Sequence, residues 1–262
     1  MLKNERVATI LSTVNQSGVV TVQELVNDLK VSSMTIRRDL DELEQERRIV
    51  RIHGGAQSIH FPDKQEASYI QKRKLNVTEK TDIAKQVASM IDENETVFLG
   101  PGTTNELVAS YLNLANLRIV TNSLPVFEQF RDKHSDYELC LVGGTYRERS
   151  GAFIGSLANE LLANIRMHKA FVGVNGINGN SIMNANSYEG QTQSIALDQS
   201  QQKFVVADHS KLDRNDFYTF YHLDKVDGLI TDQGGEKQVL DRYQKITHVY
   251  TDANTKQKER FA

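Results

Sequence analysis

Two short segments of the chain combine residue types that can hold a phosphorylated ligand. The segment Gly100–Thr104 reads Gly-Pro-Gly-Thr-Thr and begins where the apolar run 96–100 ends. Glycines let a backbone approach a ligand closely, and hydroxyls and free N–H groups at a helix start favour an anion such as phosphate. The segment Asp208–Lys211 ends another apolar run, and its aspartate and lysine suit a sugar hydroxyl and a phosphate. Because no Gly-Lys-Ser/Thr follows Gly102, the pattern is not a nucleotide-binding loop.

Each of these signals also has a purely structural explanation. A glycine-rich turn between a strand and a helix is equally a tight packing turn, and Asp208 with Lys211 is equally a surface ion pair of little energetic value. Glu189, at the start of an expected helix, suits either a sugar hydroxyl or the positive end of the helix. Lys72 and Lys80 suit either an anion or a solvated helix surface. The residue types alone leave these alternatives open.

A second set of candidate residues lies on an expected helix-turn-helix near the N-terminus. Apolar residues at helical spacing predict a first helix over 7–14, and Thr21 with Glu24 forms a capping box that opens a second. Ser32 can cap a third helix, whose first turns present basic and hydroxyl side chains outward. A DNA-reading helix inserts such side chains into the major groove. The candidate DNA-binding residues are Ser33, Met34, Thr35, Arg37, Arg38, Arg51 and His53. The last two belong to the segment after the third helix.

The segment that follows the third helix predicts a wing. Residues 47–59 read RRIVRIHGGAQSI and alternate apolar and basic residues around Gly54 and Gly55, as in two strands joined by a tight turn. Arg51 and His53 then lie beside a DNA backbone or minor groove. The alternatives are a charged three-helix bundle without DNA affinity and a protein-interaction adaptor.

The rest of the chain alternates short apolar runs with helical patterns. This alternation predicts an α/β fold with a mainly parallel sheet, on which ligands bind beyond the carboxyl ends of the strands. The expected strands are residues 96–100, 118–123, 139–144, 170–176, 204–210 and 229–232. The expected helices are residues 80–91, 104–112, 124–130, 157–165 and 189–200. The pairs Asn122-Ser123 and Gly143-Gly144 also end expected strands, so we expect both pairs near Gly100–Thr104.

Composition limits the classes of function. The chain has 262 residues with a formal net charge of -3, and residues 1–57 carry eight basic and eight acidic side chains, so DNA binding requires a local basic patch. The sequence lacks both the apolar run of about 20 residues that a membrane span needs and a signal peptide, which predicts a cytoplasmic protein without membrane contact. Cys140 is the only cysteine, which excludes an internal disulfide and a multi-cysteine zinc site. We expect no cofactor and no metal.

Both regions resemble the DeoR family of bacterial transcription regulators. The motifs T-I-R-R-D-L-x-x-L-E and R-x-H-G-G-A of the N-terminal region resemble its winged helix-turn-helix, and the resemblance extends over essentially the whole chain. The C-terminal motifs that resemble the family's sensor domain are N-x-T-E-K at 76–80, G-x-G-T-T at 100–104, T-N-S at 121–123, G-G at 143–144 and D-H-S-K at 208–211. The resemblance implies a fold similar to ribose-5-phosphate isomerase that binds a phosphorylated sugar.

The resemblance also assigns residues and a ligand. Lys72, Lys80, Asp208 and Lys211 match positions associated with inducer response, and Gly100–Thr104 matches the phosphate loop. Segments such as FLGPGTTNEL and INGNSIMNANSYEGQTQ are most similar to a lactose-operon branch of the family that responds to tagatose 6-phosphate. The candidate effector-binding residues are Lys72, Lys80, Gly100, Gly102, Thr103, Thr104, Asn122, Glu189, Asp208 and Lys211.

These observations predict a repressor with three segments. We expect a winged DNA-binding domain over 1–57, a linker over 58–70 around Pro62, and a sugar-phosphate-sensing domain over 71–262. The expected partners are double-stranded operator DNA, a phosphorylated sugar inducer and further copies of the chain in a dimer or tetramer, because one winged domain makes few base contacts. The alternatives are a repressor of another phosphotransferase operon, such as one for fructose, and a sugar-phosphate isomerase with a DNA-binding extension, in which Glu189 or Asp208 is the base.

Overall fold

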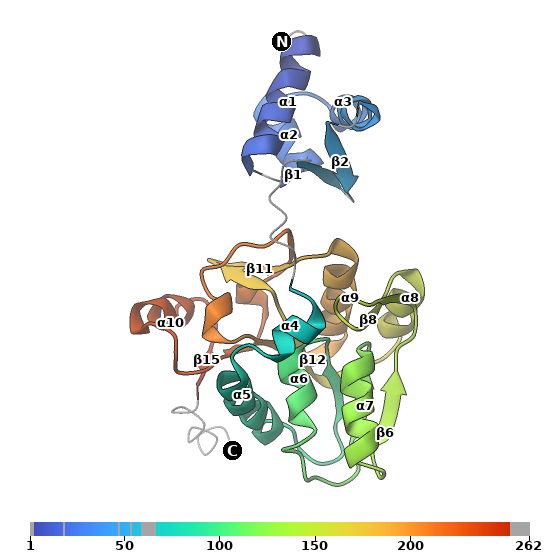
Figure 1. Ribbon diagram of the computed structural model, residues 1–262, viewed down its shortest axis with the longest axis vertical. Coiled ribbons are helices and arrows are strands. Elements are labelled where there is room, and N and C mark those ends of the chain that lie inside the picture. Colours follow the sequence, from blue (N-terminus) through green and yellow to red (C-terminus); the bar gives the residue numbers. More distant parts are fainter. Residues whose placement is uncertain (1–2, 18, 47, 53, 59–66, 252–262) are drawn as a thin grey trace. The chain divides into compact units, whose positions relative to one another are not determined.

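The chain folds as two compact units, Met1–Glu66 and Ala67–Ala262 (Figure 1). The structure is a computed structural model, and it describes residues 3–17, 19–46, 48–52, 54–58 and 67–251. Candidate residue His53 lies outside this part of the chain. Among the described helices, none has the length and apolar character needed to cross a membrane.

The first unit is a three-helix bundle with a small antiparallel sheet. Its elements are α1 (Lys3–Ser17), β1 (Val19–Thr21), α2 (Val22–Leu29), α3 (Ser33–Gln45), β2 (Ile49–Ile52) and β3 (Gly55–Ser58). The Thr21 hydroxyl accepts from the backbone N–H of Glu24 at 3.1 Å, and the Glu24 carboxylate accepts from the backbone N–H of Thr21 at 2.6 Å. This capping box starts α2 as predicted. Lys30, in the left-handed conformation at φ 53°, ends α2, and the Ser32 side chain then caps α3.

The helices of this unit pack through an apolar stripe on α3. Ile36, Leu40 and Leu43 of α3 are fully buried against α1 and α2. The sheet has the order β1-β3-β2, so the predicted two-stranded wing gains a third strand from the segment before α2. One buried contact escaped the sequence analysis: the guanidinium of Arg6 on α1 donates to the Asp39 carboxylate of α3 at 2.6 and 3.1 Å.

The second unit is built on a seven-stranded parallel sheet of order β15-β14-β12-β9-β4-β5-β6. Its strands are β4 (Thr96–Leu99), β5 (Arg118–Thr121), β6 (Glu138–Leu141), β9 (Met167–Gly173), β12 (Ser200–Val206), β14 (Gly228–Ile230) and β15 (Val249–Tyr250). The helices are α4 (Tyr69–Arg73), α5 (Val77–Ser89), α6 (Thr103–Val108), α7 (Leu124–Lys133), α8 (Ser156–Ala163), α9 (Ser187–Asp198) and α10 (Lys237–Tyr243). The predicted mainly parallel α/β fold is thereby confirmed.

Alternate residues of each central strand belong to two different cores. Phe98 of β4 packs in the core that α8, α9 and α10 cover, whereas Val97 and Leu99 pack in the core that α5, α6 and α7 cover. A sheet covered on both faces needs apolar residues at consecutive positions, because successive side chains point to opposite faces. This requirement explains the continuous apolar runs of the sequence.

Two smaller sheets lie beside the parallel sheet, and the sequence analysis predicted neither of them. One is the antiparallel hairpin of β7 (Thr145–Arg147) and β8 (Ala152–Ile154), and the other has the order β10-β11-β13. The strands of this second small sheet are β10 (Gly176–Asn178), β11 (Ser181–Asn184) and β13 (Tyr218–His222). The unit also contains two short 3-10 turns, η1 (His209–Lys211) and η2 (Leu223–Lys225). Strand β3 ends at Ser58 and α4 begins at Tyr69, so regular elements reach into both ends of the expected linker 58–70.

Candidate functional site

A pocket opens at the carboxyl ends of β4, β9 and β12 in the second unit. Eight of the ten effector-binding candidates line this pocket. The complete set of lining residues is Tyr69, Lys72, Lys80, Pro101, Gly102, Thr103, Thr104, Asn105, Ser150, Gly173, Val174, Asn175, Asn184, Glu189, Val206, Ala207, Asp208 and Lys211. Gly173 ends β9, and a Cβ there would lie 2.8 Å from the carbonyl oxygen of Pro101. The close approach of the Pro101 loop to β9 therefore requires a glycine at position 173.

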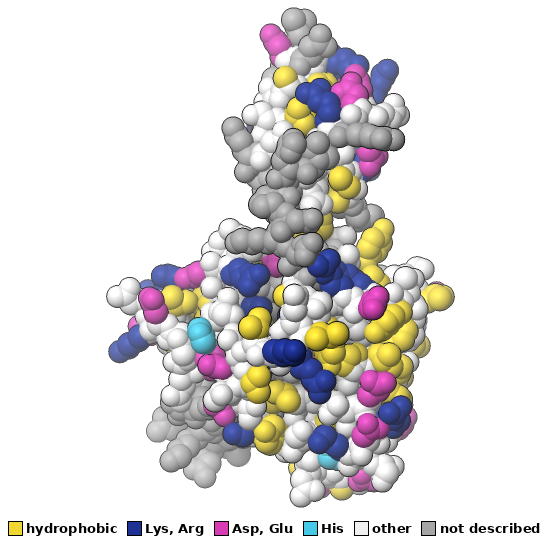
Figure 2. All heavy atoms as spheres, in the orientation of Figure 1, with side chains coloured by type: hydrophobic (Ala, Val, Ile, Leu, Met, Phe, Trp, Pro, Cys, Tyr) yellow, Lys and Arg dark blue, Asp and Glu magenta, His cyan; other side chains and the backbone are white. Residues whose placement is uncertain are grey.

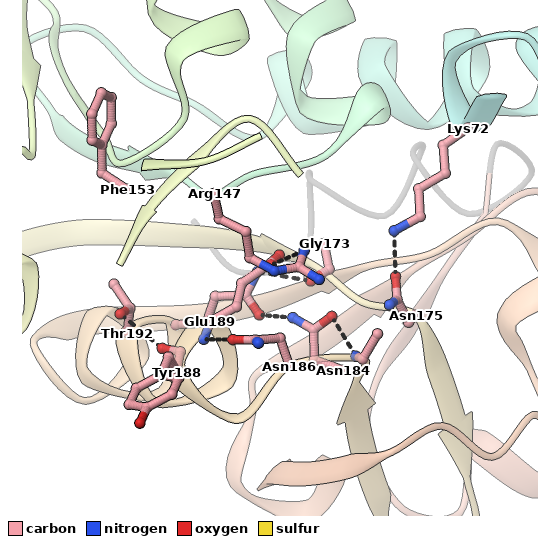
Figure 3. A network of polar contacts seen from close by, with 12 residues as sticks. Lys72, Arg147, Phe153, Gly173, Asn175, Asn184, Asn186, Tyr188, Glu189 and Thr192 are labelled. Atoms are coloured by element: carbon pink, nitrogen blue, oxygen red, sulfur yellow. Dashed lines mark hydrogen bonds and ion pairs between the residues drawn. The ribbon is translucent and has the colours of Figure 1, made fainter. Parts of the chain in front are cut away.

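Lys72 and Lys80 enter the pocket from α4 and α5. The Lys72 ammonium donates to Asn175 Oδ1 at 3.0 Å (Figure 3). Lys80 is buried, and its ammonium donates to the carbonyl of Leu75 at 2.6 Å and to that of Lys72. Burial lowers the pKa of Lys80, although Asp208 and Glu106 oppose this shift. These bonds connect the side chain of Lys80 in α5 to the backbone at the C-terminal end of α4.

Asp208 and Lys211 face the same space from the turn after β12. Asp208 is buried, and its Oδ1 accepts from Asn76 Nδ2 at 2.8 Å and from the backbone N–H of Ser210 at 3.1 Å. Burial would raise the pKa of Asp208, but the bonds from Ser210 and Asn76 and the charges of Lys211 and Lys80 lower it overall. Burial lowers the pKa of Lys211, against the opposing effect of Asp208. The aspartate is therefore a fixed anion between cations.

Glu189 lines the pocket from the first turn of α9. Its Oε2 is 3.2 Å from Nη1 of Arg147, a residue of strand β7, and its backbone N–H donates to Asn186 Oδ1 at 3.0 Å (Figure 3). Next to it, Asn184 Nδ2 donates to Gln193 Oε1 at 2.9 Å, and Gln193 Nε2 donates to the carbonyl of Gly173 at 3.1 Å. These bonds hold the carboxylate and amide groups of this wall in defined orientations.

The structure does not bring every predicted strand end to the pocket. Gly100 is buried behind it, where its N–H donates to the carbonyl of Phe171 at 2.9 Å. Asn122 is fully buried and donates to the carbonyl of Phe153 at 2.8 Å, so it braces β8. Neither Gly143 nor Gly144 lines the pocket, and a Cβ at Gly144 would lie 2.7 Å from the carbonyl oxygen of Ile154, so Gly144 packs closely against β8. Strands β5 and β6 lie beyond β4 in the sheet, which explains why their ends are remote from β12.

Several lining residues were missed in the sequence analysis. Asn175 and Asn184 come from the end of β9 and from β11, and Ser150 comes from the turn of the β7–β8 hairpin. The Ser150 hydroxyl is buried and has no hydrogen-bond partner among the described residues. The asparagine-rich segment 175–186 was the available signal for Asn175 and Asn184, but without the strand topology no spacing rule places them at the pocket.

A buried carboxyl group lies directly behind the pocket on α6. Glu106 is 4% exposed, and its Oε2 accepts from the Tyr69 hydroxyl of α4 at 2.7 Å and is 3.7 Å from Nε of Arg73. Burial raises the pKa of Glu106 to about 7, although Tyr69, Arg73 and Lys80 act in the opposite direction. Burial and the bond to Glu106 raise the pKa of Tyr69 strongly. Glu106 was not among the predicted site residues, because it lies within an expected helix where no motif or strand end distinguishes it.

The first unit presents the predicted basic surface on α3. Ser33, Met34, Arg37 and Arg38 are exposed, and Met34 is 77% exposed despite its apolar side chain. Thr35 is half-buried, and its hydroxyl lies 2.9 Å from the Ser32 hydroxyl within the cap. The exposed arginines and Ser33 have the arrangement expected of a helix that reads the major groove.

Arg51 is more constrained than the sequence indicated. Its guanidinium donates to the carbonyl of Gly55 at 3.1 Å and lies 3.2 Å from the Asp41 carboxylate, and its backbone N–H donates to Glu44. The side chain is only 20% exposed. Arg51 therefore joins the wing to α3.

A winged helix-turn-helix followed by a parallel α/β unit with a cationic pocket defines a ligand-responsive DNA-binding regulator. Residues 6–61 match the DeoR-like helix-turn-helix domain, and residues 75–233 match the DeoR C terminal sensor domain. The chain belongs to the DeoR family of transcription regulators. The family resemblance predicted from the sequence motifs is thus confirmed.

Relatives match over almost their whole length. The lactose phosphotransferase system repressor of Streptococcus mutans is 40% identical over 249 residues, which cover 94% of this chain and 99% of that protein. The protein of the same name from Lactococcus lactis is 41% identical over 254 residues, with coverage of 95% and 98%. Among solved structures, ribose 5-phosphate isomerase A of Methanocaldococcus jannaschii is similar with a TM-score of 0.37 and 15% identity, over 52% of this chain and 55% of that chain.

Proposed function

We propose that this protein represses sugar-catabolism genes by binding operator DNA and is released by a phosphorylated sugar, with tagatose 6-phosphate as the first choice. A DNA-binding repressor of sugar catabolism is the function that its family and its relatives support. The relatives, which are lactose phosphotransferase system repressors, favour lactose or galactose use through the tagatose 6-phosphate pathway. We place the protein in the cytoplasm, acting as a homo-oligomer.

The observation that carries the inducer proposal is the charge of the pocket. Lys72, Lys80 and Lys211 line it together with the two carboxylates of Asp208 and Glu189. Lys211 is close enough to Lys72, Lys80 and Arg214 for their charges to lower its pKa, so a phosphate dianion near it reduces the repulsion and gains a charge-assisted partner. Gly102 and the hydroxyls of Thr103 and Thr104 complete the proposed phosphate subsite. The carboxylates and the asparagines are acceptors and donors for sugar hydroxyls.

Calorimetry of the full chain against matched pairs of sugars tests this proposal. We expect tagatose 6-phosphate to bind and tagatose not to bind, because only the phosphate brings a dianion that can accept charge-assisted hydrogen bonds in the pocket. Galactose 6-phosphate, fructose 6-phosphate and fructose 1-phosphate test the identity of the sugar. Equal binding of tagatose and its 6-phosphate contradicts a phosphate-binding site, and preferential binding of a fructose phosphate assigns the repressor to another operon.

Turnover of sugar phosphates tests the enzymatic alternative. An isomerase needs a carboxylate that takes a proton from the substrate carbon. Here Glu189 is ion-paired with Arg147, and Asp208 Oδ1 accepts bonds from Asn76 and Ser210. We expect no isomer to form when the full chain is incubated with pentose and hexose phosphates. Isomer formation that Glu189→Gln or Asp208→Asn abolishes would establish an enzyme.

A further inference from the structure

Two side chains that line the pocket each have a buried polar atom without a hydrogen-bond partner. These atoms are Oγ of Ser150 and Oδ1 of Asn105, and neither has a partner among the described residues. Ser150 belongs to the turn of the β7–β8 hairpin and Asn105 to α6, so the two atoms come from distant parts of the sequence. Buried polar atoms are normally paired, and an unpaired one costs free energy. A cavity lined by two such atoms is therefore suited to a ligand that pairs with both.

The orientation of the Asn105 amide group is fixed by two carbonyl groups. Its Nδ2 donates to the carbonyl oxygen of Gly100 at 2.9 Å and to that of Phe171 at 3.0 Å. A carbonyl oxygen only accepts hydrogen bonds, so the amide cannot turn over, and Oδ1 remains the unpaired atom. Asn105 is also fully buried. A ligand that pairs with Oδ1 must therefore bring a hydrogen-bond donor to a fixed position.

Tyr69 of α4 connects these two residues in one corner of the pocket. Its backbone N–H donates at 2.9 Å to the carbonyl of Arg149, the residue before Ser150. Its hydroxyl donates at 2.7 Å to Oε2 of Glu106, the residue after Asn105. Tyr69, Asn105 and Ser150 all line the pocket, and we refer to these three residues as the Tyr69 corner.

Helix α4 is held against α6 by contacts of the same carboxyl group. Figure 2 shows Lys and Arg side chains at the surface around the place where Figure 1 labels α4. Arg73 of this helix has its Nε 3.7 Å from Oε2 of Glu106, which also accepts from the Tyr69 hydroxyl. The residues of the Tyr69 corner are thereby held in defined positions, which lowers the cost of ordering them around a ligand.

The lysines of the pocket form a region of different chemistry. Burial lowers the pKa of Lys211, and the charges of Lys72 and Lys80 lower it further, so the three ammonium groups lie within electrostatic range of one another. A phosphate dianion accepts hydrogen bonds but donates none, so it pairs with ammonium groups and not with Oδ1 of Asn105. A sugar hydroxyl donates as well as accepts, so it can pair with Oδ1 of Asn105 and with the Ser150 hydroxyl together.

We propose that the Tyr69 corner binds the hydroxyl group at the end of the sugar opposite its phosphate, and that Ser150 and Asn105 thereby determine which sugar phosphates bind. This inference deepens the proposed function and rests on it, since it requires a phosphorylated sugar in the pocket. For tagatose 6-phosphate the group is the hydroxyl on carbon 1, which donates to Oδ1 of Asn105 and accepts from the Ser150 hydroxyl. A sugar phosphate without this hydroxyl leaves both protein atoms unpaired.

Calorimetry of the full chain in a double-mutant cycle tests this assignment. The proteins are the wild type and Ser150→Ala, and the ligands are tagatose 6-phosphate and 1-deoxytagatose 6-phosphate. We expect the wild type to bind the deoxy ligand about fivefold or more weakly, because hydrogen bonds are lost. The loss should be smaller in Ser150→Ala by about threefold, because one partner of the hydroxyl is already absent. The loss that remains in the variant measures the bond to Asn105.

Two controls distinguish a ligand contact from a structural role of Ser150. Ser110→Ala removes an exposed serine hydroxyl just after α6, and this variant should bind both ligands as the wild type does. Urea unfolding without sugar should find Ser150→Ala at least as stable as the wild type, because the variant removes a buried hydroxyl that has no partner among the described residues. A clear loss of stability without sugar would show that Ser150 serves the fold, which contradicts the proposal.

The remaining outcomes separate this proposal from the proposed function. Equal losses in the wild type and in Ser150→Ala, or no loss in either, overturn the role of the Tyr69 corner and leave the sugar-phosphate inducer intact. If a fructose or galactose phosphate binds in place of tagatose 6-phosphate, the same cycle is run with that sugar and its analogue without the hydroxyl farthest from the phosphate. A wild type that binds none of these sugar phosphates contradicts the proposed inducer class and the Tyr69 corner together.

Discussion

Glu106 of α6 is a buried carboxyl group with an unusual protonation behaviour. The carboxyl group is buried behind the pocket, where Oε1 has no hydrogen-bond partner among the described residues and Oε2 accepts from Tyr69. Burial favours the neutral acid, because removing a carboxylate from water costs more than these contacts return. The contact between Glu106 and Tyr69 holds α4 against α6, so the protonation of one carboxyl group affects the helix that bears Lys72.

The raised pKa predicts a pH dependence of stability. The pKa of Glu106 is about 7 in the folded protein against an ordinary value of 4.5. Between those values the folded chain retains a proton that the unfolded chain has released, so stability falls as pH rises. The contribution is complete below pH 4.5 and is lost as pH rises through about 7, a difference of up to about 3 kcal/mol.

Urea unfolding of the wild type and of Glu106→Gln at about pH 5 and about pH 8 measures this effect. The glutamine resembles the neutral acid, so the variant should lose less stability between the two pH values than the wild type. Identical pH dependence in both proteins would show that Glu106 does not titrate in this range.

At the scale of elements, local signals predicted the parts of the fold that local interactions determine. Thr21 with Glu24 and Ser32 identified helix starts because a cap is made by neighbours in sequence. Apolar runs located the central strands because both faces of the sheet are covered. The β7–β8 hairpin was missed because Thr145–Arg147 is short and mostly exposed, so neither length nor periodicity distinguished it from a loop. Ser150 was missed with it.

The candidate site was predictable only where the sequence marks a strand end. Gly102, Asp208 and Lys211 follow buried strands that prove to be close in the sheet. Asn122 follows a strand in the same way, yet β5 lies on the far side of β4. Spacing along the chain does not give strand order, and strand order decides which ends meet.

The exposed face of α3 predicts a loss of operator affinity on mutation. Arg37→Ala and Arg38→Ala should each cost about 1–3 kcal/mol in operator binding if their guanidinium groups contact bases. Gel-shift titration measures the loss, and Gln23→Ala, an exposed position on α2, is a control for surface changes in the same unit. Unchanged affinity in a folded Arg37→Ala/Arg38→Ala double variant would remove α3 from the interface.

The wing predicts a different response at Arg51. Its contacts with Asp41 and Gly55 hold β2 and β3 against α3, so Arg51→Ala both removes a charge near DNA and loosens the wing. Operator binding should weaken similarly for all sequences, with a shallower dependence on salt. Titrations at two salt concentrations test this prediction, and a loss confined to one operator sequence would instead indicate a base contact.

At the scale of the whole molecule, the proposed coupling predicts repressors that no longer respond to the sugar. Lys211 and Asp208 belong to the second unit, so Lys211→Ala or Asp208→Ala should leave operator affinity near that of the wild type when no sugar is present. Sugar phosphate should then release much less protein from DNA, because the ligand no longer discriminates between the two states.

Operator binding with and without saturating tagatose 6-phosphate measures this response. In cells the expected phenotype is permanent repression. A variant that releases DNA at the wild-type sugar concentration would exclude its residue from the site. Loss of DNA binding in the absence of sugar would instead indicate that the residue is needed for folding. The control for removal of a positive charge is Lys74→Ala, because Lys74 is an exposed residue just after α4.

The order of strands in the sheet has a consequence for the protein while it is being synthesised. The winged unit is complete once Ser58 has left the ribosome, and its contacts are local in sequence, so it can fold early. The pocket needs β4, β9 and β12 side by side, and its last lining residue is Lys211. A nascent or prematurely terminated chain that ends before β12 therefore contains the DNA-reading helix without the means to sense the sugar. Nonsense mutations in the second half of the gene are then expected to leave at most a short product that binds the operator weakly, because one winged unit makes few base contacts.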